Sequence, residues 1–333
     1  MRRPSVRLSG MLLAAGALAL TGCTGNSDSP AGGGGEGKLD VVASTNVYGN
    51  ILETVGGDNI SVTAVINRPS QDPHSYEATA RDKLAVSEAD LVVLNGGGYD
   101  TFMEQLVADA GIDSADVLNA VEISGLEEHD DAAGHDDAAG HDDAAAGHEE
   151  DHDHGGHSHG SFNEHVWYSP AAMGLLAEAA AERLSTLDPD NAEGYRDNAA
   201  TFNSGVEDLL ADLDADKAAA GNREVAVTEP VPEYLFEAAG LHNVTPADFT
   251  SAVEEGSDVP PAVLKEMQDL LRSGDIAFLA YNTQTSTSQT EAVRETAENA
   301  GVPVLDFSET LPDGKDYLSW MGANVAAIDD VLR

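Results

Sequence analysis

Short apolar runs alternate with helix-forming stretches in both halves of the chain. In the first half, strands are predicted at residues 39–43, 60–66, 91–94 and 116–121, and helices at 51–55, 78–89 and 99–110. In the second half, strands are predicted at residues 224–228, 276–280 and 302–305, and helices at 231–239, 260–272, 286–300 and 316–332. Strands that alternate with helices in this way indicate parallel sheets covered on both faces. The pattern predicts an α/β protein with two lobes.

A helical region without strands, residues 170–221, separates the two halves. It is interrupted once, at Leu187-Asp188-Pro189, and a proline is well placed in the first turn of a helix because it needs no N–H partner there. We therefore expect one long helix at about residues 189–219. This helix would be a stiff spine between a first lobe at 39–169 and a second lobe at 222–333.

The N-terminus has the features of an export signal. Three arginines in the first seven residues precede an apolar stretch at 11–20, which is too short to cross a bilayer as a helix. The stretch ends in Leu20-Thr21-Gly22-Cys23, which is typical of a signal that is cut before a lipidated cysteine. We expect residues 1–22 to be the signal peptide and Cys23 the lipid attachment point. Residues 23–38, rich in Gly, Ser, Asn and Asp, are predicted to be a flexible tether.

A low-complexity tract at residues 126–160 repeats histidine followed by paired acids. It has no large apolar residue after Leu126, so we expect it to be disordered without metal. Neutral imidazoles at short spacing suit zinc, copper or nickel, and the acids between them concentrate cations. The tract therefore predicts an accessory metal-binding loop with these histidines: His129, His135, His141, His148, His152, His154, His157 and His159.

The composition excludes several classes of protein. The chain has 333 residues and a formal net charge of −44, from 16 Lys and Arg against 60 Asp and Glu. Nucleic acid is excluded as a partner because its binding requires basic residues to neutralise phosphates. Docking on anionic lipid through a basic patch is excluded for the same reason, so any membrane contact depends on the lipid anchor. The single cysteine excludes a disulfide framework and a cysteine-based zinc finger.

Three histidines lie outside the tract. His74 follows the second predicted strand, and His165 follows the fourth by way of the tract. In open α/β sheets ligands bind beyond the carboxyl ends of the strands, so both positions suit a binding site. His242 follows a predicted helix and is interpreted as capping its C-terminus. Glu77 and Glu164, next to the two motifs, are interpreted as surface or capping residues.

Four motifs together resemble the zinc- and manganese-binding lipoproteins of ABC importers, the cluster A-I solute-binding proteins. They are DPHSYE around His74, NGGGYDTFMEQL at 95–106, EHVWYSP around His165 after the histidine tract, and LDPDNAEGYRDNAATF at 187–202. The resemblance covers residues 39–333. It implies two α/β lobes joined by a long helix, with one metal ion in the cleft between the lobes and two ligands from each lobe.

Carried over by motif, the resemblance makes His74 and His165 the ligands from the first lobe. It places the third ligand just after the first strand of the second lobe, at Glu229, and the fourth after the last strand, at Glu309, with Asp306 as the alternative. The chain departs from the pattern before His165, where it has Asn163-Glu164 and relatives often have Asp-Pro.

Two imidazoles and two carboxylates would also accept Mn²⁺, whereas the histidine tract favours Zn²⁺. We therefore expect a monomeric zinc receptor outside the cell membrane that delivers Zn²⁺ to an ABC permease with a cytoplasmic ATPase. The alternatives are a manganese receptor of the same family, or an extracellular metal buffer or adhesin. An enzyme is not expected, because four protein ligands leave no open position on zinc.

Overall fold

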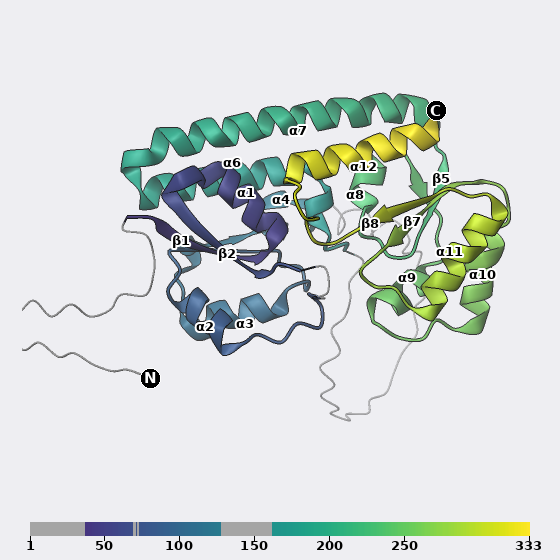
Figure 1. Ribbon diagram of the computed structural model, residues 1–333, viewed down its shortest axis with the longest axis horizontal. Coiled ribbons are helices and arrows are strands. Elements are labelled where there is room, and N and C mark those ends of the chain that lie inside the picture. The colour runs from purple at the N-terminus through teal and green to yellow at the C-terminus, as the bar shows by residue number, and fades with distance from the viewer. Residues whose placement is uncertain (1–36, 69–70, 72, 128–161) are drawn as a thin grey trace, which may run out of the picture. The chain divides into compact units, whose positions relative to one another are not determined.

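The computed structural model describes residues 37–68, 71, 73–127 and 162–333. Its first lobe is built on a parallel sheet with the strand order β2-β1-β3-β4 (Figure 1). The elements of this lobe are β1 (Leu39–Thr45), α1 (Asn46–Gly56), β2 (Ile60–Ile66), α2 (Ala80–Ser87), β3 (Leu91–Leu94), α3 (Thr101–Ala110), β4 (Val117–Asn119) and α4 (Ala120–Ser124). Because the strands are parallel, the loops that follow them lie at one edge of the sheet.

The second lobe repeats this topology with the strand order β6-β5-β7-β8. Its elements are β5 (Glu224–Val227), α8 (Glu233–Ala238), β6 (His242–Asn243), α9 (Ala247–Glu254), α10 (Pro261–Leu271), β7 (Ile276–Asn282), α11 (Ser288–Ala300), β8 (Val304–Phe307) and α12 (Tyr317–Leu332). In each sheet the strand that comes first in the lobe pairs with the second and the third. The predicted α/β fold with two parallel sheets is confirmed.

The strands form where the chain has continuous apolar runs. All four residues of β3 and the last five of β1 are buried, as expected for parallel strands that helices cover on both faces. Several helices begin at a capping box, in which a side chain before the helix and one in its first turn bond each other's backbone N–H. These boxes are Thr79 with Asp82, Thr287 with Thr290, and Asp316 with Ser319.

Two long helices, α6 (Pro170–Leu187) and α7 (Ala192–Ala220), connect the lobes. α7 has 29 residues, or about 44 Å at 1.5 Å per residue. It packs against α6 and α1 of the first lobe and, toward its C-terminal end, against α12 and α8 of the second lobe (Figure 1). The helix begins three residues later than predicted, because residues 189–191 form a 3₁₀ turn. The spine helix of the sequence analysis is thus present and contacts helices of both lobes.

The two lobes share one hydrophobic core. Its buried residues run from Val41 in the first sheet, through α6 and α7, to Leu332 at the end of α12. Polar contacts join the lobes within this core: the Tyr317 hydroxyl donates to the Trp167 carbonyl at 2.9 Å, and the Tyr168 hydroxyl donates to the Ser308 carbonyl at 2.8 Å. Two smaller cores lie on the outer faces of the two sheets. The lobes are therefore packed together and do not form separate domains on a linker.

Several sequence predictions need correction. The fourth strand ends at Asn119, because the side chain of that residue accepts a hydrogen bond from the Glu122 N–H and caps α4. β6 and α9 were not predicted. His242 does not cap a helix: it lies exposed in the edge strand β6. The proposed signal peptide, Cys23 and the histidine tract from residue 128 to 160 lie outside the described residues.

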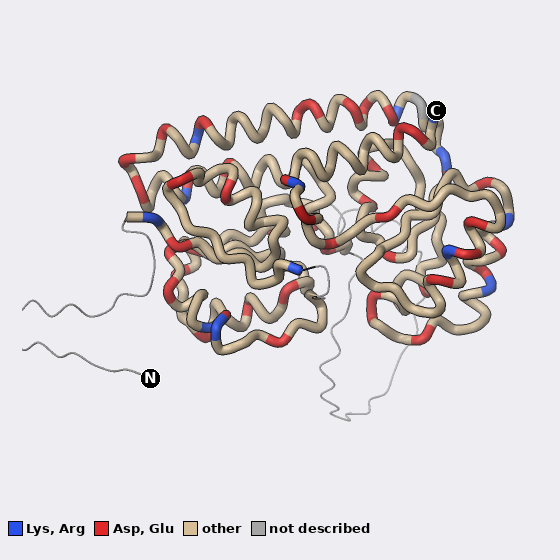
Figure 2. Tube along the Cα trace, in the orientation of Figure 1, with Lys and Arg blue, Asp and Glu red and all other residues tan. Residues whose placement is uncertain are grey.

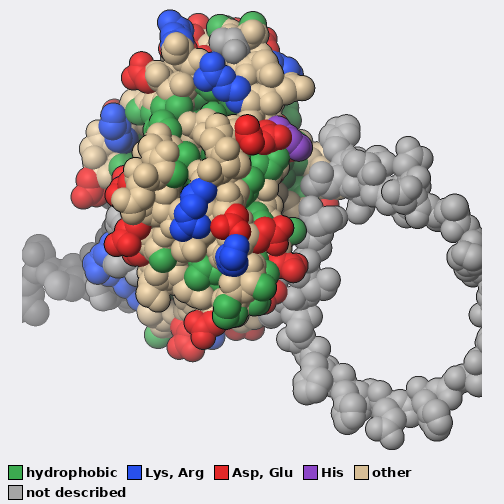
Figure 3. Space-filling model, turned by 90° about the vertical axis from the view of Figure 1, so that its right-hand side faces the viewer, with side chains coloured by type: hydrophobic (Ala, Val, Ile, Leu, Met, Phe, Trp, Pro, Cys, Tyr) green, Lys and Arg blue, Asp and Glu red, His purple; other side chains and the backbone are tan. Residues whose placement is uncertain are grey.

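Acidic residues are spread over both lobes and along α7, and basic residues are few (Figure 2). On the face shown in Figure 3, acidic and basic side chains are interspersed among small apolar areas. Within the described parts of the chain, no helix is both long enough and apolar enough to cross a membrane. The charge is thus distributed over the surface of the lobes.

Gly96, in the loop after β3, adopts a left-handed backbone with φ of +80°. A Cβ atom there would lie 2.3 Å from the Asn119 side chain. We expect Gly96→Ala to lower the free energy of unfolding by about 2 kcal/mol, because it adds backbone strain and displaces the cap of α4. Gly111→Ala is the matched control: its φ is +67° but a Cβ atom meets nothing within 4 Å, so it should cost only about 1 kcal/mol. If urea unfolding shows the same loss of unfolding free energy for both variants, the contact with Asn119 does not contribute.

Candidate metal centre

Two histidines from distant parts of the first lobe meet at its edge. His74 lies in a turn after β2, and His165 immediately precedes the 3₁₀ turn of residues 166–168. His165 is only 1% exposed, and its ring centroid is 6.2 Å from that of His74. The two imidazoles are thus close neighbours although 90 residues separate them in the chain. The structure thus brings together the two histidines that the sequence analysis selected, and their role as metal ligands stays a prediction.

A hydrogen bond fixes the orientation of His165. Its Nδ1 lies 2.7 Å from the Asn163 side-chain oxygen, which can only accept, so Nδ1 carries the proton and Nε2 keeps a free lone pair. The Asn163 amide in turn donates to the Pro230 carbonyl of the second lobe at 2.9 Å. Burial, and then the neighbouring His74, hold the pKa of His165 well below its usual value. His165 is therefore neutral at physiological pH, the form that binds metals.

Two buried carboxylates of the second lobe, both predicted as ligands, lie close to each other beyond its strands. Glu229 follows β5 and Glu309 follows β8, and they are 5% and 3% exposed. The Asn282 side-chain amide, at the end of β7, contacts both: it donates to Glu309 Oε1 at 2.8 Å and makes a close contact with Glu229 Oε2. Burial, and then the charge of Glu309, raise the pKa of Glu229 to about 7. Two buried acids this close repel each other when both are ionised, so the pair favours a proton or a cation.

Tyr99 connects the two halves. Its hydroxyl donates to Glu309 Oε2 at 3.1 Å, and its ring centroid is 4.9 Å from the His74 ring and 5.8 Å from the His165 ring. Burial, and then Glu309, raise the pKa of Tyr99, which keeps the hydroxyl protonated as a donor. Its loop is held by Asp100, which accepts from the backbone N–H of Asn95 at 2.7 Å. The NGGGYD motif thus places a tyrosine between the histidines and the second-lobe acid.

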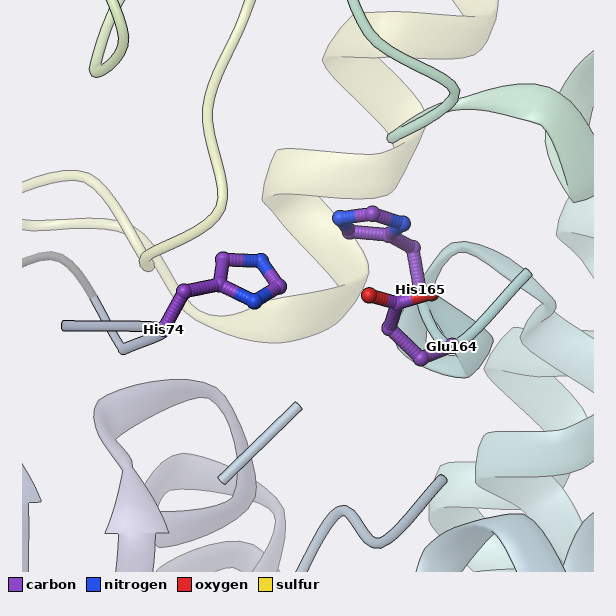
Figure 4. Close-up of side chains that lie close together, drawn as sticks. All are labelled: His74, Glu164 and His165. Atoms are coloured by element: carbon purple, nitrogen blue, oxygen red, sulfur yellow. The ribbon is translucent and has the colours of Figure 1, made fainter. Parts of the chain in front are cut away.

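Glu164 corrects one sequence interpretation. It is neither a surface nor a helix-capping residue, because it is only 7% exposed and lies beside the histidines. One donor atom each from His74, Glu164 and His165 lies within 4.8 Å of the others (Figure 4). The backbone carbonyl of Glu164 accepts from the Asn95 amide at 3.0 Å, which holds this segment against the loop after β3. Glu77, by contrast, is exposed as expected.

Asp306, the alternative fourth ligand, is not brought to this cluster. It lies on β8, its side chain is 52% exposed, and it forms an ion pair with Arg294 at 3.1 Å. Glu309, two residues beyond the end of β8, contacts Tyr99 and Asn282, whereas Asp306 is paired with Arg294. The geometry favours Glu309 over Asp306.

The arrangement gathers imidazole nitrogens and carboxylate oxygens from loops that follow parallel strands of both lobes. Such a donor set suits a divalent ion of the zinc or manganese type, and a cation would relieve the repulsion between the two second-lobe acids. The sequence analysis did not identify the residues that orient these ligands, Tyr99, Asn163 and Asn282. Asn282 stands at the carboxyl end of a buried strand, and Tyr99 stands just beyond another. Ligands bind beyond such strand ends, so this position could have marked both residues as part of the site.

Comparisons with known proteins show the family and the fold of the chain. A family model described as zinc-uptake complex component A, periplasmic, matches residues 41–331. The zinc-binding lipoprotein AdcA of Streptococcus pneumoniae (strain ATCC BAA-255 / R6) is 25% identical over 97% of this chain and 60% of its own length. The chain therefore spans about three fifths of that relative.

Two further comparisons cover nearly the whole of the matching protein. The manganese ABC transporter substrate-binding lipoprotein PsaA of Streptococcus pneumoniae serotype 4 (strain ATCC BAA-334 / TIGR4) is 23% identical over 97% of each chain. Among solved structures, the periplasmic zinc binding protein TroA from Treponema pallidum matches with a TM-score of 0.68 and 18% identity, over 89% of this chain and 99% of that one. At this identity the structural match shows a shared fold.

Proposed function

This chain belongs to the periplasmic zinc-uptake complex component A family, and we propose that it is a receptor that binds one Zn²⁺ outside the cell membrane and delivers it to an ABC importer. The observation that carries the proposal is the position of Tyr99, whose ring lies against the rings of His74 and His165 and whose hydroxyl donates to Glu309. Glu309 in turn shares the Asn282 amide with Glu229. The proposed ligands are His74, His165, Glu229 and Glu309. Members of this family are uptake components and not enzymes, so the ion is cargo and no chemical step is assigned.

The proposed partners are a membrane permease and its cytoplasmic ATPase. The name of PsaA describes an ABC transporter substrate-binding lipoprotein, and AdcA is also named a lipoprotein. We propose the same arrangement here, with Cys23 as the lipid attachment point after removal of residues 1–22. The anchor would keep the receptor at the outer face of the membrane, beside its permease, since several acyl chains bind a bilayer stably.

Zinc is the proposed cargo, with manganese as the second candidate. Zinc binds imidazole more tightly than manganese does, and the histidines at 129–159 would add to that preference as a zinc-collecting loop. Two observations favour manganese instead: the second lobe supplies two carboxylates and no histidine, and a third carboxylate, Glu164, lies beside the imidazoles. Hard oxygen ligands are the type that Mn²⁺ prefers.

The test is a competitive titration of Zn²⁺ and Mn²⁺ into the mature chain, residues 23–333, and into a version without residues 127–160. We expect both proteins to hold one tight Zn²⁺ and to bind Mn²⁺ much more weakly, with additional weaker zinc sites only when the tract is present. A shortened chain that prefers Mn²⁺ would make manganese the cargo. Loss of all tight binding would place the metal site in the tract and overturn the proposed centre.

Transport is tested separately in cells of the source organism that lack the gene. We expect these cells to grow poorly when a chelator limits zinc, and to take up radioactive Zn²⁺ slowly, until the gene is restored. A gene with His165→Ala should fail to restore uptake, whereas one with His242→Ala should succeed, because His242 lies exposed in β6. Normal zinc uptake without the gene would favour a metal buffer or adhesin.

A further inference from the structure

Glu164 differs from the other carboxylates of the centre because no residue in the described part of the chain bonds its side chain. It is 7% exposed, and within residues 37–68, 71, 73–127 and 162–333 no hydrogen-bond donor or cation contacts its carboxylate. A carboxylate oxygen that accepts no hydrogen bond from the protein keeps its lone pairs available for a cation.

The Glu164 carboxylate lies toward the imidazoles. Figure 4 shows one of its oxygens on the side where the His74 and His165 rings approach each other. Donor atoms of these three residues lie within 4.8 Å of one another, a spacing that small side-chain rotations can close around one ion. All three residues belong to the first lobe. Two imidazoles and one glutamate also form a known three-ligand set for zinc, which leaves a coordination position open.

The second-lobe acids, by contrast, have hydrogen-bond partners within the protein. Both oxygens of Glu309 accept hydrogen bonds, from Tyr99 and Asn282, and Oε2 of Glu229 contacts Asn282 and Thr285. An ion that engages these acids must compete with those donors. An ion that engages Glu164 breaks no hydrogen bond among the described residues. An ion therefore meets less competition from hydrogen-bond donors at the carboxylate of the first lobe than at those of the second.

We propose that His74, Glu164 and His165 form a capture site in the first lobe alone, which binds the divalent ion before the carboxylates of the second lobe engage it. The proposal rests on the proposed function, because it concerns the order in which one centre fills. The open position of the three-ligand site then accepts a second-lobe carboxylate. Glu164 is thus a metal ligand during entry, in a place where relatives of this family often have proline.

The test uses Zn²⁺ and, as a spectroscopic probe, Co²⁺ with the mature chain. The double variant Glu229→Gln with Glu309→Gln removes the second-lobe carboxylates. We expect it to retain one weaker site whose Co²⁺ spectrum shows visible absorption bands. Adding Glu164→Gln should weaken that site by more than about tenfold and change the spectrum, and Glu164→Asp should restore part of the affinity. Glu77→Gln, an exposed acid beside His74, is the matched control.

Stopped-flow mixing tests the order of filling in the otherwise unchanged chain. We expect Glu164→Gln to slow Zn²⁺ association more than it speeds dissociation, whereas Glu77→Gln changes neither. The proposal is overturned if the double variant binds no ion, or if Glu164→Gln behaves as Glu77→Gln does in both experiments. If the unchanged chain itself lacks a tight site, it is the proposed function that fails. If His165→Ala abolishes binding and Glu164→Gln has no effect, only the capture site fails.

Discussion

Replacement of His165 by alanine is expected to weaken Zn²⁺ binding by at least about 100-fold. Four ligands share a binding free energy on the order of 10–16 kcal/mol in structural zinc sites, so losing one costs roughly 3 kcal/mol. The loss should be close to this full value because His165 is already oriented: Asn163 fixes its Nδ1, and its ring packs at 5.1 Å from that of Trp167. No other described imidazole besides His74 is near enough to replace it.

Competitive titration with a zinc chelator measures this effect. His242→Ala is the matched control, because it removes an exposed imidazole of β6 and should leave the affinity unchanged. Circular dichroism of both variants must show an intact fold, since His165→Ala also opens a small cavity beside Trp167. A folded His165→Ala protein with unchanged zinc affinity would remove His165 from the centre.

The second large effect concerns pH and Glu229. Its pKa is raised to about 7, so near neutrality the metal-free protein carries a proton there that a bound ion must displace. We expect the zinc affinity to fall about tenfold for each pH unit below 7 and to level off above about pH 8. In Glu229→Gln the affinity should be lower, and this part of its pH dependence should disappear. Glu295→Gln, an exposed acid of α11, should behave as the unchanged protein does.

The same raised pKa predicts how the stability of the metal-free protein depends on pH. Between the ordinary value of 4.5 and about 7, the folded state holds a proton that the unfolded state has released. The resulting stability is fully present below pH 4.5 and is lost as the pH rises through 7, a change on the order of 3 kcal/mol. Glu254, whose pKa is raised to about 8 mainly by burial, acts in the same direction. Urea unfolding without metal, from pH 5 to 8, should therefore show a smaller decline in Glu229→Gln, and an equal decline would contradict the assignment to Glu229.

The elements that were predicted correctly have a local signal. β2 and β3 match their predicted bounds because each is an apolar run enclosed by turn residues. His74 and His165 were selected as candidate ligands because each stands in a motif beyond a strand, and the structure brings their rings together. The edge strand β6 has only two residues and leaves no recognisable pattern in the sequence. Helix α9, of eight residues, lies between prolines and polar residues that resemble a loop.

The errors at the site have a different physical cause. Glu164 is polar, and nothing in its neighbourhood along the chain indicates burial. It is buried because Asn95, 69 residues earlier, bonds its backbone carbonyl. Asn282 likewise ends an apolar strand, and it matters only because Glu229 and Glu309 arrive from two other strands. The role of a residue that orients a ligand is set by contacts between segments far apart in the chain. Those contacts cannot be predicted from a single sequence.

The core that the lobes share has a consequence for the time that an ion stays bound. Asn46 of α1 exchanges two hydrogen bonds of 2.9 Å with the backbone of Leu311, so the lobes are also joined close to Glu309. When the ligands are already in place, little of the binding free energy is lost in ordering them. The higher affinity that results appears mainly as a lower dissociation rate of the ion. For nanomolar affinity and an association rate on the order of 10⁷ M⁻¹s⁻¹, the ion would remain for about 100 s. Spontaneous escape would then be too slow to supply a transporter, and the work of extracting the ion would fall to the permease and the ATP that drives it.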